Sequence, residues 1–205
     1  MIYQGVINRS SINKQRIIRT LLNNPTGNLT KYQVAKESWC KFPTAHEILK
    51  KLQNKDLIIG TKVIDYEALV KEWIQSQIKP NRYGYLIKNP IKLLKKVKLN
   101  YVLTTYIAEN TVQRYLIPSV TEFYINSVEK TIWHNIIIEE GGLIGRGNIT
   151  ILSGDEHVFY KSFEKDSLNY VSIPQLIIDL TNEGGVCIDA ADKLIKREKD
   201  ALSKL

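Results

Sequence analysis

The fold of the first third of the chain follows from residues 30–52, which read TKYQVAKESWCKFPTAHEILKKL. Thr30 is a typical helix N-cap and precedes a short helix over 31–38. A further helix starts after residues 39–42, with Pro43 in its first turn. Its apolar residues have the spacing of one buried helix face: Ala45, Ile48, Leu49 and Leu52. The stretch therefore predicts two consecutive amphipathic helices joined by a turn.

The segments on either side extend this pattern. Upstream, a helix begins near Ser11, carries one apolar stripe (Ile17, Ile18, Leu21 and Leu22) and stops at the turn cluster 24–28. Downstream, 57–59 and 63–64 are typical of two short strands around a tip at 60–62. Three helices followed by a small hairpin is the order of a winged helix-turn-helix, so we expect an N-terminal domain of that kind.

Residues 32–36 (YQVAK), 42–46 (FPTAH) and 49–52 (LKKL) are similar to the winged helices of many prokaryotic transcription regulators. The small Ala35 allows the second and third helices to approach closely. Trp39 occupies a turn position that is often glycine in tight units, which indicates a wider turn. In this geometry the third helix reads the DNA.

The polar side of the third helix and its surroundings supply the residues that we expect to contact duplex DNA: Lys41, Thr44, His46, Glu47, Lys50, Lys51 and Lys62. Short polar residues near a helix start reach base edges, whereas lysines further along meet phosphates. Lys41 in the turn and Lys62 at the hairpin tip would add backbone contacts. Two alternatives stay open, a simply solvated helix face and a winged helix that binds protein.

The charge distribution favours DNA. The net charge is +8, but residues 1–100 hold 19 Lys/Arg against 6 Asp/Glu (+13), and residues 101–205 hold 10 against 15 (−5). A lysine-rich proteome would raise both halves. The asymmetry therefore indicates a nucleic acid or another anionic surface as the partner of the basic half.

A connector links the two halves. Asp65 is a typical N-cap for a fourth helix, whose broad stripe is Tyr66, Leu69, Val70, Trp73 and Ile74. A turn cluster over 79–85 then breaks the periodicity. We therefore predict three regions, a winged-helix domain with its connector helix (1–78), a basic linker or helix (79–99) and a second domain (100–205). Lys92, Lys95 and Lys96 would form a second strip near DNA or an ordinary solvated face.

The second domain mixes strands and helices. We expect strands over 101–103, 121–125, 148–152 and 157–163, and helices over 108–116, 128–140, after Ser172 and from Asp189. The overall fold class is therefore α+β, with an α/β domain in the second half.

Residues 103–110 (LTTYIAEN) and 171–180 (VSIPQLIIDL), followed by EGG at 183–185 and AA at 190–191, resemble a known family. It is the antitoxin and transcriptional regulator of type IV abortive-infection toxin–antitoxin systems, in which a winged helix precedes a nucleotidyltransferase-like domain. The resemblance covers nearly the whole chain. It implies an autoregulating repressor that opposes a toxin without forming a stable toxin complex.

Nucleotidyl transfer needs a phosphate-binding turn and two carboxylates that alternate along a strand. One register combines a turn at 104–105 with Glu122, but Tyr124 stands where the second carboxylate should be. The other combines a turn at 141–142 with 155–156, adjacent acids that point to opposite faces of a strand and read more simply as hairpin-turn residues. We therefore expect no catalytic residues and a scaffold or effector site. The rival hypothesis is a nucleotidyltransferase that its winged helix recruits to nucleic acid.

Other classes of protein are excluded by composition. No apolar run reaches the roughly 18 residues of a membrane-spanning helix, and the N-terminus lacks the layout of a secretory signal. Cys40 and Cys187 have no zinc-site spacing. We therefore expect a cytoplasmic, homodimeric DNA-binding regulator that is not an enzyme, with no cofactor, no metal and no membrane partner.

Overall fold

The computed structural model describes residues 9–204 and shows an α+β protein, as expected. The chain divides into two compact units, one made of residues up to 78 together with those from 195 onward, and one made of residues 79–194. The first unit holds 16 Lys/Arg against 8 Asp/Glu, and the second holds 13 against 13. The whole net charge of +8 therefore belongs to the first unit.

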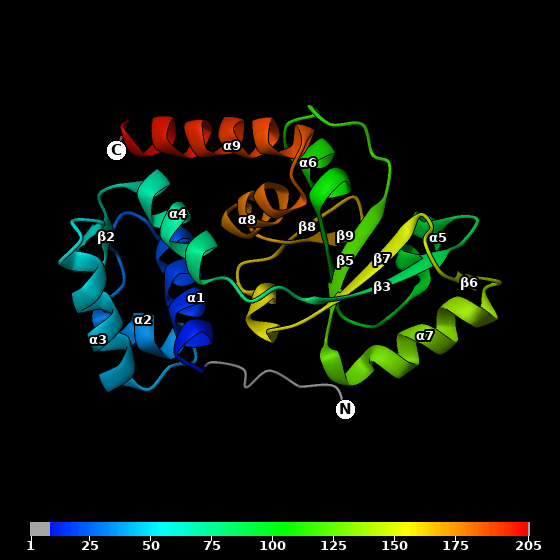
Figure 1. Cartoon of the computed structure of the whole chain (residues 1–205), viewed down its shortest axis with the longest axis horizontal. Coiled ribbons are helices and arrows are strands. Elements are labelled where there is room, and N and C mark those ends of the chain that lie inside the picture. Colours follow the sequence, from blue (N-terminus) through cyan, green and yellow to red (C-terminus); the bar gives the residue numbers. More distant parts are fainter. Residues whose placement is uncertain (1–8, 205) are drawn as a thin grey trace. The chain divides into compact units, whose positions relative to one another are not determined.

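The described part of the first unit contains the elements predicted from the sequence (Figure 1). In chain order they are α1 (Arg9–Leu22), α2 (Lys31–Glu37), α3 (Phe42–Gln53), β1 (Ile58–Ile59), β2 (Lys62–Val63) and α4 (Tyr66–Ser76). The strands β1 and β2 form an antiparallel hairpin. The long helix α9 (Val186–Leu202) begins in the second unit and ends in the first.

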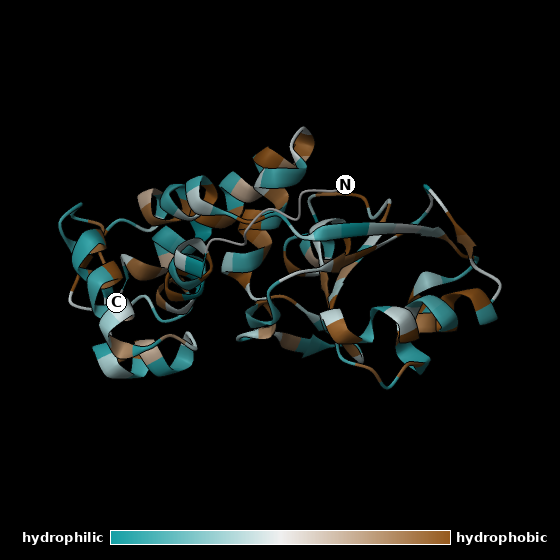
Figure 2. Ribbon diagram, turned by 60° about the horizontal axis from the view of Figure 1, so that its bottom comes forward, coloured by the Kyte–Doolittle hydropathy of each residue, from teal (hydrophilic) through white to brown (hydrophobic). Residues whose placement is uncertain are grey.

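Local sequence signals explain where these helices begin and which face they bury. Thr30 caps α2 through a reciprocal capping box with Gln33. Asp65 caps α4 by accepting a 2.9 Å hydrogen bond from the backbone N–H of Ala68. The predicted apolar face of α3 is buried. Figure 2 shows the resulting alternation of apolar and hydrophilic residues around the helices.

The turn between α2 and α3 is not widened by Trp39. This residue adopts the left-handed conformation, with a φ of +54°, that a glycine would supply. The backbone N–H of Cys40 donates to the carbonyl of Ala35 at 2.9 Å and closes the turn. The guanidinium of Arg16 lies 5.1 Å from the centre of the Trp39 ring, a cation–π contact that offsets part of the backbone strain.

The second unit is built on a mixed sheet. Its described strands are β3 (Asn81–Leu86), β4 (Tyr101–Thr104), β5 (Thr121–Ile125), β6 (Leu143–Ile144), β7 (Ile149–Ser153), β8 (Phe163–Lys165) and β9 (Leu168–Tyr170), in the order β6-β3-β7-β5-β4-β9-β8. The pairs β5–β7 and β4–β9 are parallel, and the other pairs are antiparallel. The central strands β4 and β5 are fully buried.

Helices cover both faces of this sheet (Figure 1). They are α5 (Pro90–Lys96), α6 (Thr105–Val112), α7 (Lys130–Glu139) and α8 (Ile173–Glu183), with two short 3-10 helices, η1 (Ser127–Glu129) and η2 (Glu156–Phe159). On one face Trp133 of α7 packs against Tyr101 and Phe123, at ring-centre distances of 6.0 and 5.1 Å. Because neighbouring strand residues point to opposite faces, Glu122 and Tyr124 point to the other face, toward α6 and α8.

The structure corrects three expectations. Residues 79–99, predicted as a basic linker or helix, contain a helix at α5 but no linker at 81–86, which form β3 and pair with both β6 and β7. Residues from 195 onward join the first unit instead of ending the second. The segment 157–163 is not a strand after a hairpin turn, because Asp155 caps η2 and His157 is buried within that turn of helix. The hairpin partner of β8 is β9.

In the described part of the chain, no helix combines the length and apolar character needed to cross a bilayer.

Candidate functional site

The predicted DNA-contacting residues all lie on accessible surface of the first unit. Six of them are exposed, and Thr44 is half-buried. Thr44, His46, Glu47, Lys50 and Lys51 belong to α3, and Lys41 is its N-cap residue. Because the opposite face of α3 is the buried one, the polar face is available to a partner along the whole helix.

Lys62 does not lie at the tip of the hairpin. It belongs to β2, and the tip is formed by Gly60 and Thr61. A Cβ atom added to Gly27 would come within 2.8 Å of the Lys62 Cβ, so the loop before α2 packs closely against this strand. The side chain of Lys62 is nevertheless exposed.

The lysines around α3 and the hairpin differ from those on the α4 side of the unit in whether they form ion pairs. Among the described residues, Lys41, Lys50, Lys51 and Lys62 form no ion pair. On the α4 side, in contrast, the lysines are paired with acids. Lys14 and Lys55 share the carboxylate of Glu72, at 2.5 and 2.8 Å, and Lys71 pairs with Glu67 at 2.8 Å. In the described part of the chain, lysines without ion-pair partners thus lie on α3 and the hairpin, and also at Lys31 and Lys36 of α2 and at Lys196 of α9.

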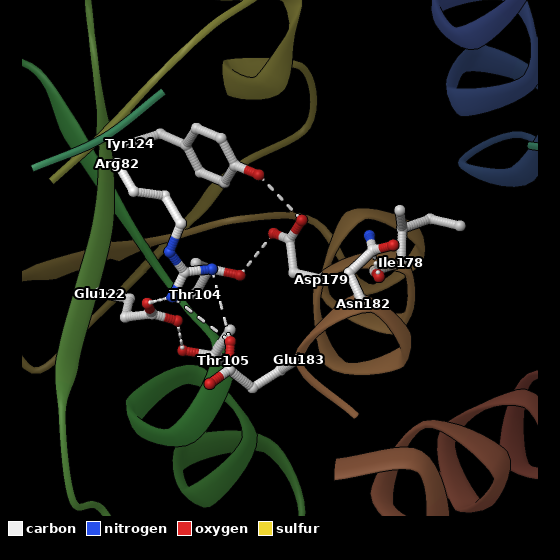
Figure 3. A network of polar contacts seen from close by, with 9 residues as sticks. All are labelled: Arg82, Thr104, Thr105, Glu122, Tyr124, Ile178, Asp179, Asn182 and Glu183. Atoms are coloured by element: carbon white, nitrogen blue, oxygen red, sulfur yellow. Dashed lines mark hydrogen bonds and ion pairs between the residues drawn. The ribbon is translucent and has the colours of Figure 1, made fainter. Parts of the chain in front are cut away.

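A second cluster of polar side chains lies in the second unit, on the face of the sheet that α6 and α8 cover (Figure 3). Asp179 of α8 projects toward the strands. Its carboxylate accepts hydrogen bonds from the hydroxyls of Thr104 (2.6 Å) and Tyr124 (2.8 Å) and from the side-chain amide of Gln175 (2.8 Å). Asp179 is 6% exposed, and these three donors compensate the loss of water around its carboxylate.

The neighbouring carboxylate, Glu122, is held in a similar way. It is 2% exposed, accepts a 2.8 Å hydrogen bond from the hydroxyl of Thr105 and forms an ion pair with Arg82. Arg82 also pairs with Glu183 at 3.3 Å, so its guanidinium bridges two acids (Figure 3). Burial raises the pKa of the Glu122 carboxyl, and the Thr105 hydrogen bond and the Arg82 charge oppose that rise.

The structure thus brings together the residues of the first nucleotidyltransferase register. Thr104 ends β4 and Thr105 begins α6, while Glu122 and Tyr124 share one face of β5. Thr105 has a φ of +46°, a conformation that is strained for a β-branched residue. The residues of the second register instead serve helix ends, because the glycines at 141–142 follow α7 and Asp155 caps η2.

Sequence reasoning missed three members of this cluster. Arg82 lies in the segment that we assigned to a linker. Asp179 carries a recognisable signal, a single acid within the apolar run LIIDL of a helix, because a charge at such a position is retained only with partners. Glu183 follows at i+4 from Asp179, near the end of α8. Arg82 gives no comparable signal, since its partners are 40 and 101 residues away.

A cleft of about 620 Å³ opens beside Arg82, Glu122 and Glu183, and it is also lined by Arg146 and Thr150. Among the described residues, no three His, Cys, Asp or Glu side chains gather as a metal site would require. The cleft presents positively charged guanidinium groups and negatively charged carboxylates, which suit a small polar ligand.

The chain was compared with models of protein families, with curated proteins and with solved structures, and none of the three comparisons gave a significant match.

Proposed function

We propose that this protein is a transcriptional regulator that binds duplex DNA through α3, its preceding turn and the β1–β2 hairpin. The observation that carries the proposal is electrostatic. The first unit holds the entire net charge of +8, and among the described residues four of its lysines without ion-pair partners gather at the start of α3, along α3 and on the hairpin. An exposed helix with uncompensated lysines is suited to the phosphate backbone.

The order of elements supports the winged-helix interpretation of this unit. In that arrangement α3 enters the major groove, and its first turns contact base edges. Thr44 and Glu47 are then the candidates for base contacts, and His46 adds a polar group beside them. Lys41, Lys50, Lys51 and Lys62 bind phosphates, which fix the position of the protein without reading sequence.

The second unit serves, in this proposal, as a scaffold or effector domain and not as an enzyme. Glu122 and Asp179 are engaged by internal donors, and Tyr124 takes the place of a second strand carboxylate. Together with the resemblance to type IV antitoxins, this favours an autoregulating antitoxin-like repressor. A dimer would place two copies of α3 one helical turn apart on a palindromic operator. No stable complex with a toxin is required.

The salt dependence of DNA binding tests the proposal with the full-length chain. Each phosphate neutralised releases counterions, so log affinity falls by about 0.9 per phosphate for each unit of log salt. We expect a steep decline, and Lys50→Ala should reduce the slope by about one unit. Lys71→Ala is the matched control, because Lys71 is already paired with Glu67. A salt-independent affinity, or equal effects of the two variants, would contradict DNA binding through α3.

A further inference from the structure

Three large aromatic side chains are exposed around the turn between α2 and α3. The exposed fractions are 67% for Tyr32, 56% for Trp39 and 42% for Phe42. The ring of Phe42 lies 6.1 Å from that of Tyr32 and 5.9 Å from that of His46. An apolar surface of this kind at the start of α3 has a cost in water and indicates a partner.

The charged residues beside these three aromatic side chains indicate what kind of partner this surface binds. Lys31 precedes Tyr32 in α2, and Lys41 precedes Phe42 at the start of α3. Both lysines are exposed, and neither forms an ion pair among the described residues. An apolar protein surface would leave these lysines without a partner. Duplex DNA satisfies both features, because it carries phosphates outside and the C5-methyl groups of thymine in the major groove.

Position within the helix distinguishes Phe42 from the other aromatic residues. It is the first residue of α3, and the N-terminal residues of a recognition helix are those that reach base edges. Trp39, in contrast, already has Arg16 over its ring. Phenylalanine is among the side chains that make apolar contacts with the thymine methyl.

We propose that Phe42, supported by the ring of Tyr32, contacts the methyl group of a thymine in the major groove and makes the protein select thymine at that position. This inference rests on the proposed function and adds a feature of the operator. The methyl group loses contact with water when it is covered by the ring. Removing one such group should weaken binding about fourfold, the factor that corresponds to burying one methylene.

The experiment removes the thymine methyl group and the Phe42 ring, each alone and both together. The full-length chain selects its preferred duplex from a randomised 20-base-pair library, and each thymine of that duplex is then replaced singly by deoxyuridine, which lacks only the methyl group. Affinities are measured for the wild type, for Phe42→Ala and for Ile117→Ala. Ile117 is 86% exposed in the second unit, so its variant controls for the loss of an exposed apolar side chain. Thermal unfolding confirms that each variant is folded, and Phe42→Leu provides a second, milder truncation.

We expect at least one deoxyuridine to weaken binding of the wild type and of Ile117→Ala about fourfold. The same replacement should have no effect on Phe42→Ala and a reduced effect on Phe42→Leu. Sequence-selective binding with no deoxyuridine effect, or with an effect that Phe42→Ala retains, would overturn the inference and leave the proposed function standing. Failure to select any duplex would overturn the proposed function, and the inference with it.

Discussion

The hydroxyl of Thr105 donates a 2.8 Å hydrogen bond to the carboxylate of Glu122, although the backbone of Thr105 is in the left-handed region with a φ of +46°. Such strain costs on the order of 1–3 kcal/mol and persists only where surrounding contacts enforce it. Here the bond joins the start of α6 to the middle of the sheet. The hydrogen bond therefore helps to hold Thr105 in its strained conformation, and it provides the buried Glu122 carboxylate with a donor.

The first prediction concerns this hydrogen bond. Thr105→Ala removes the donor and leaves one oxygen of a buried carboxylate without it, so the free energy of unfolding should fall by about 1–3 kcal/mol. Thr105→Ser keeps the donor and should stay close to the wild type. Urea denaturation of both variants measures the difference. Equal losses in the two variants would show that the hydroxyl of Thr105 does not stabilise the fold.

The raised pKa of Glu122 predicts a pH dependence of stability. A carboxyl whose pKa is higher in the folded state binds protons there more readily, so its contribution is present at low pH and is lost as pH rises through the folded-state pKa. The pH range in which this contribution is lost begins near the ordinary glutamate pKa of 4.5 and extends upward. Other acids titrate in the same range, so the useful quantity is the stability of the wild type minus that of Glu122→Gln. This difference should fall as the pH of denaturation experiments is raised from 4 to 7, and a difference that rises would refute the assigned direction.

The sequence predicts the first unit well because its signals are local. The capping residues Thr30 and Asp65, the proline at the start of α3 and the 3.6-residue spacing of apolar positions each act within a few residues. The width of the α2–α3 turn was predicted wrongly, because the general rule reserves positive φ for glycine. At Trp39, tertiary contacts override that preference.

Trp39 offers a further test of this interpretation. Trp39→Gly and Trp39→Ala both remove the contact with Arg16, but only glycine adopts the left-handed backbone without penalty. We therefore expect the glycine variant to be more stable than the alanine variant by about 1 kcal/mol. Thermal or urea unfolding of the pair measures this directly. If alanine were equal or better, the turn would not need the left-handed conformation.

The second unit was predicted less completely because its organisation depends on distant pairing. The strand β3 lies in a stretch that reads as a turn cluster, so periodicity gave no indication that it pairs with β7, about 70 residues away. The Thr104–Thr105 turn and Glu122 could be predicted because nucleotidyl transfer requires a phosphate-binding turn and carboxylates on a strand. Their partners Arg82 and Asp179 come from other elements, and only the fold shows them together.

Base reading and phosphate binding by α3 should be separable by mutation. Thr44→Ala or Glu47→Ala should change which sequences are preferred, by about 1–3 kcal/mol for a lost base contact. Lys62→Ala should weaken all sequences alike and reduce the salt slope by about one unit. Competition binding against a panel of duplexes that differ at single base pairs measures both effects. The assignment of α3 as the recognition helix would be wrong if Thr44→Ala and Glu47→Ala weakened every duplex equally.

The last prediction is that the second unit transfers no nucleotide. Two-metal phosphoryl transfer requires carboxylates that converge on ions about 3.5–4 Å apart. Glu122 is engaged by Thr105 and Arg82, and the residue that shares its face of β5 is Tyr124. A phenol has a pKa of about 10 and is a poor ligand for a hard cation near neutral pH. The protein incubated with labelled nucleoside triphosphates, Mg²⁺ or Mn²⁺ and RNA acceptors should therefore yield no transfer product.

The variant Glu122→Gln gives this experiment its control. Glutamine keeps an oxygen that accepts the Thr105 hydrogen bond but removes the negative charge that a metal ion would need. Transfer that is detectable in the wild type and lost in this variant would make the protein an enzyme and would reverse the proposed role of the second unit. Transfer that survives the substitution would also contradict the prediction, and it would place the reaction at acids outside the Thr105–Glu122 pair.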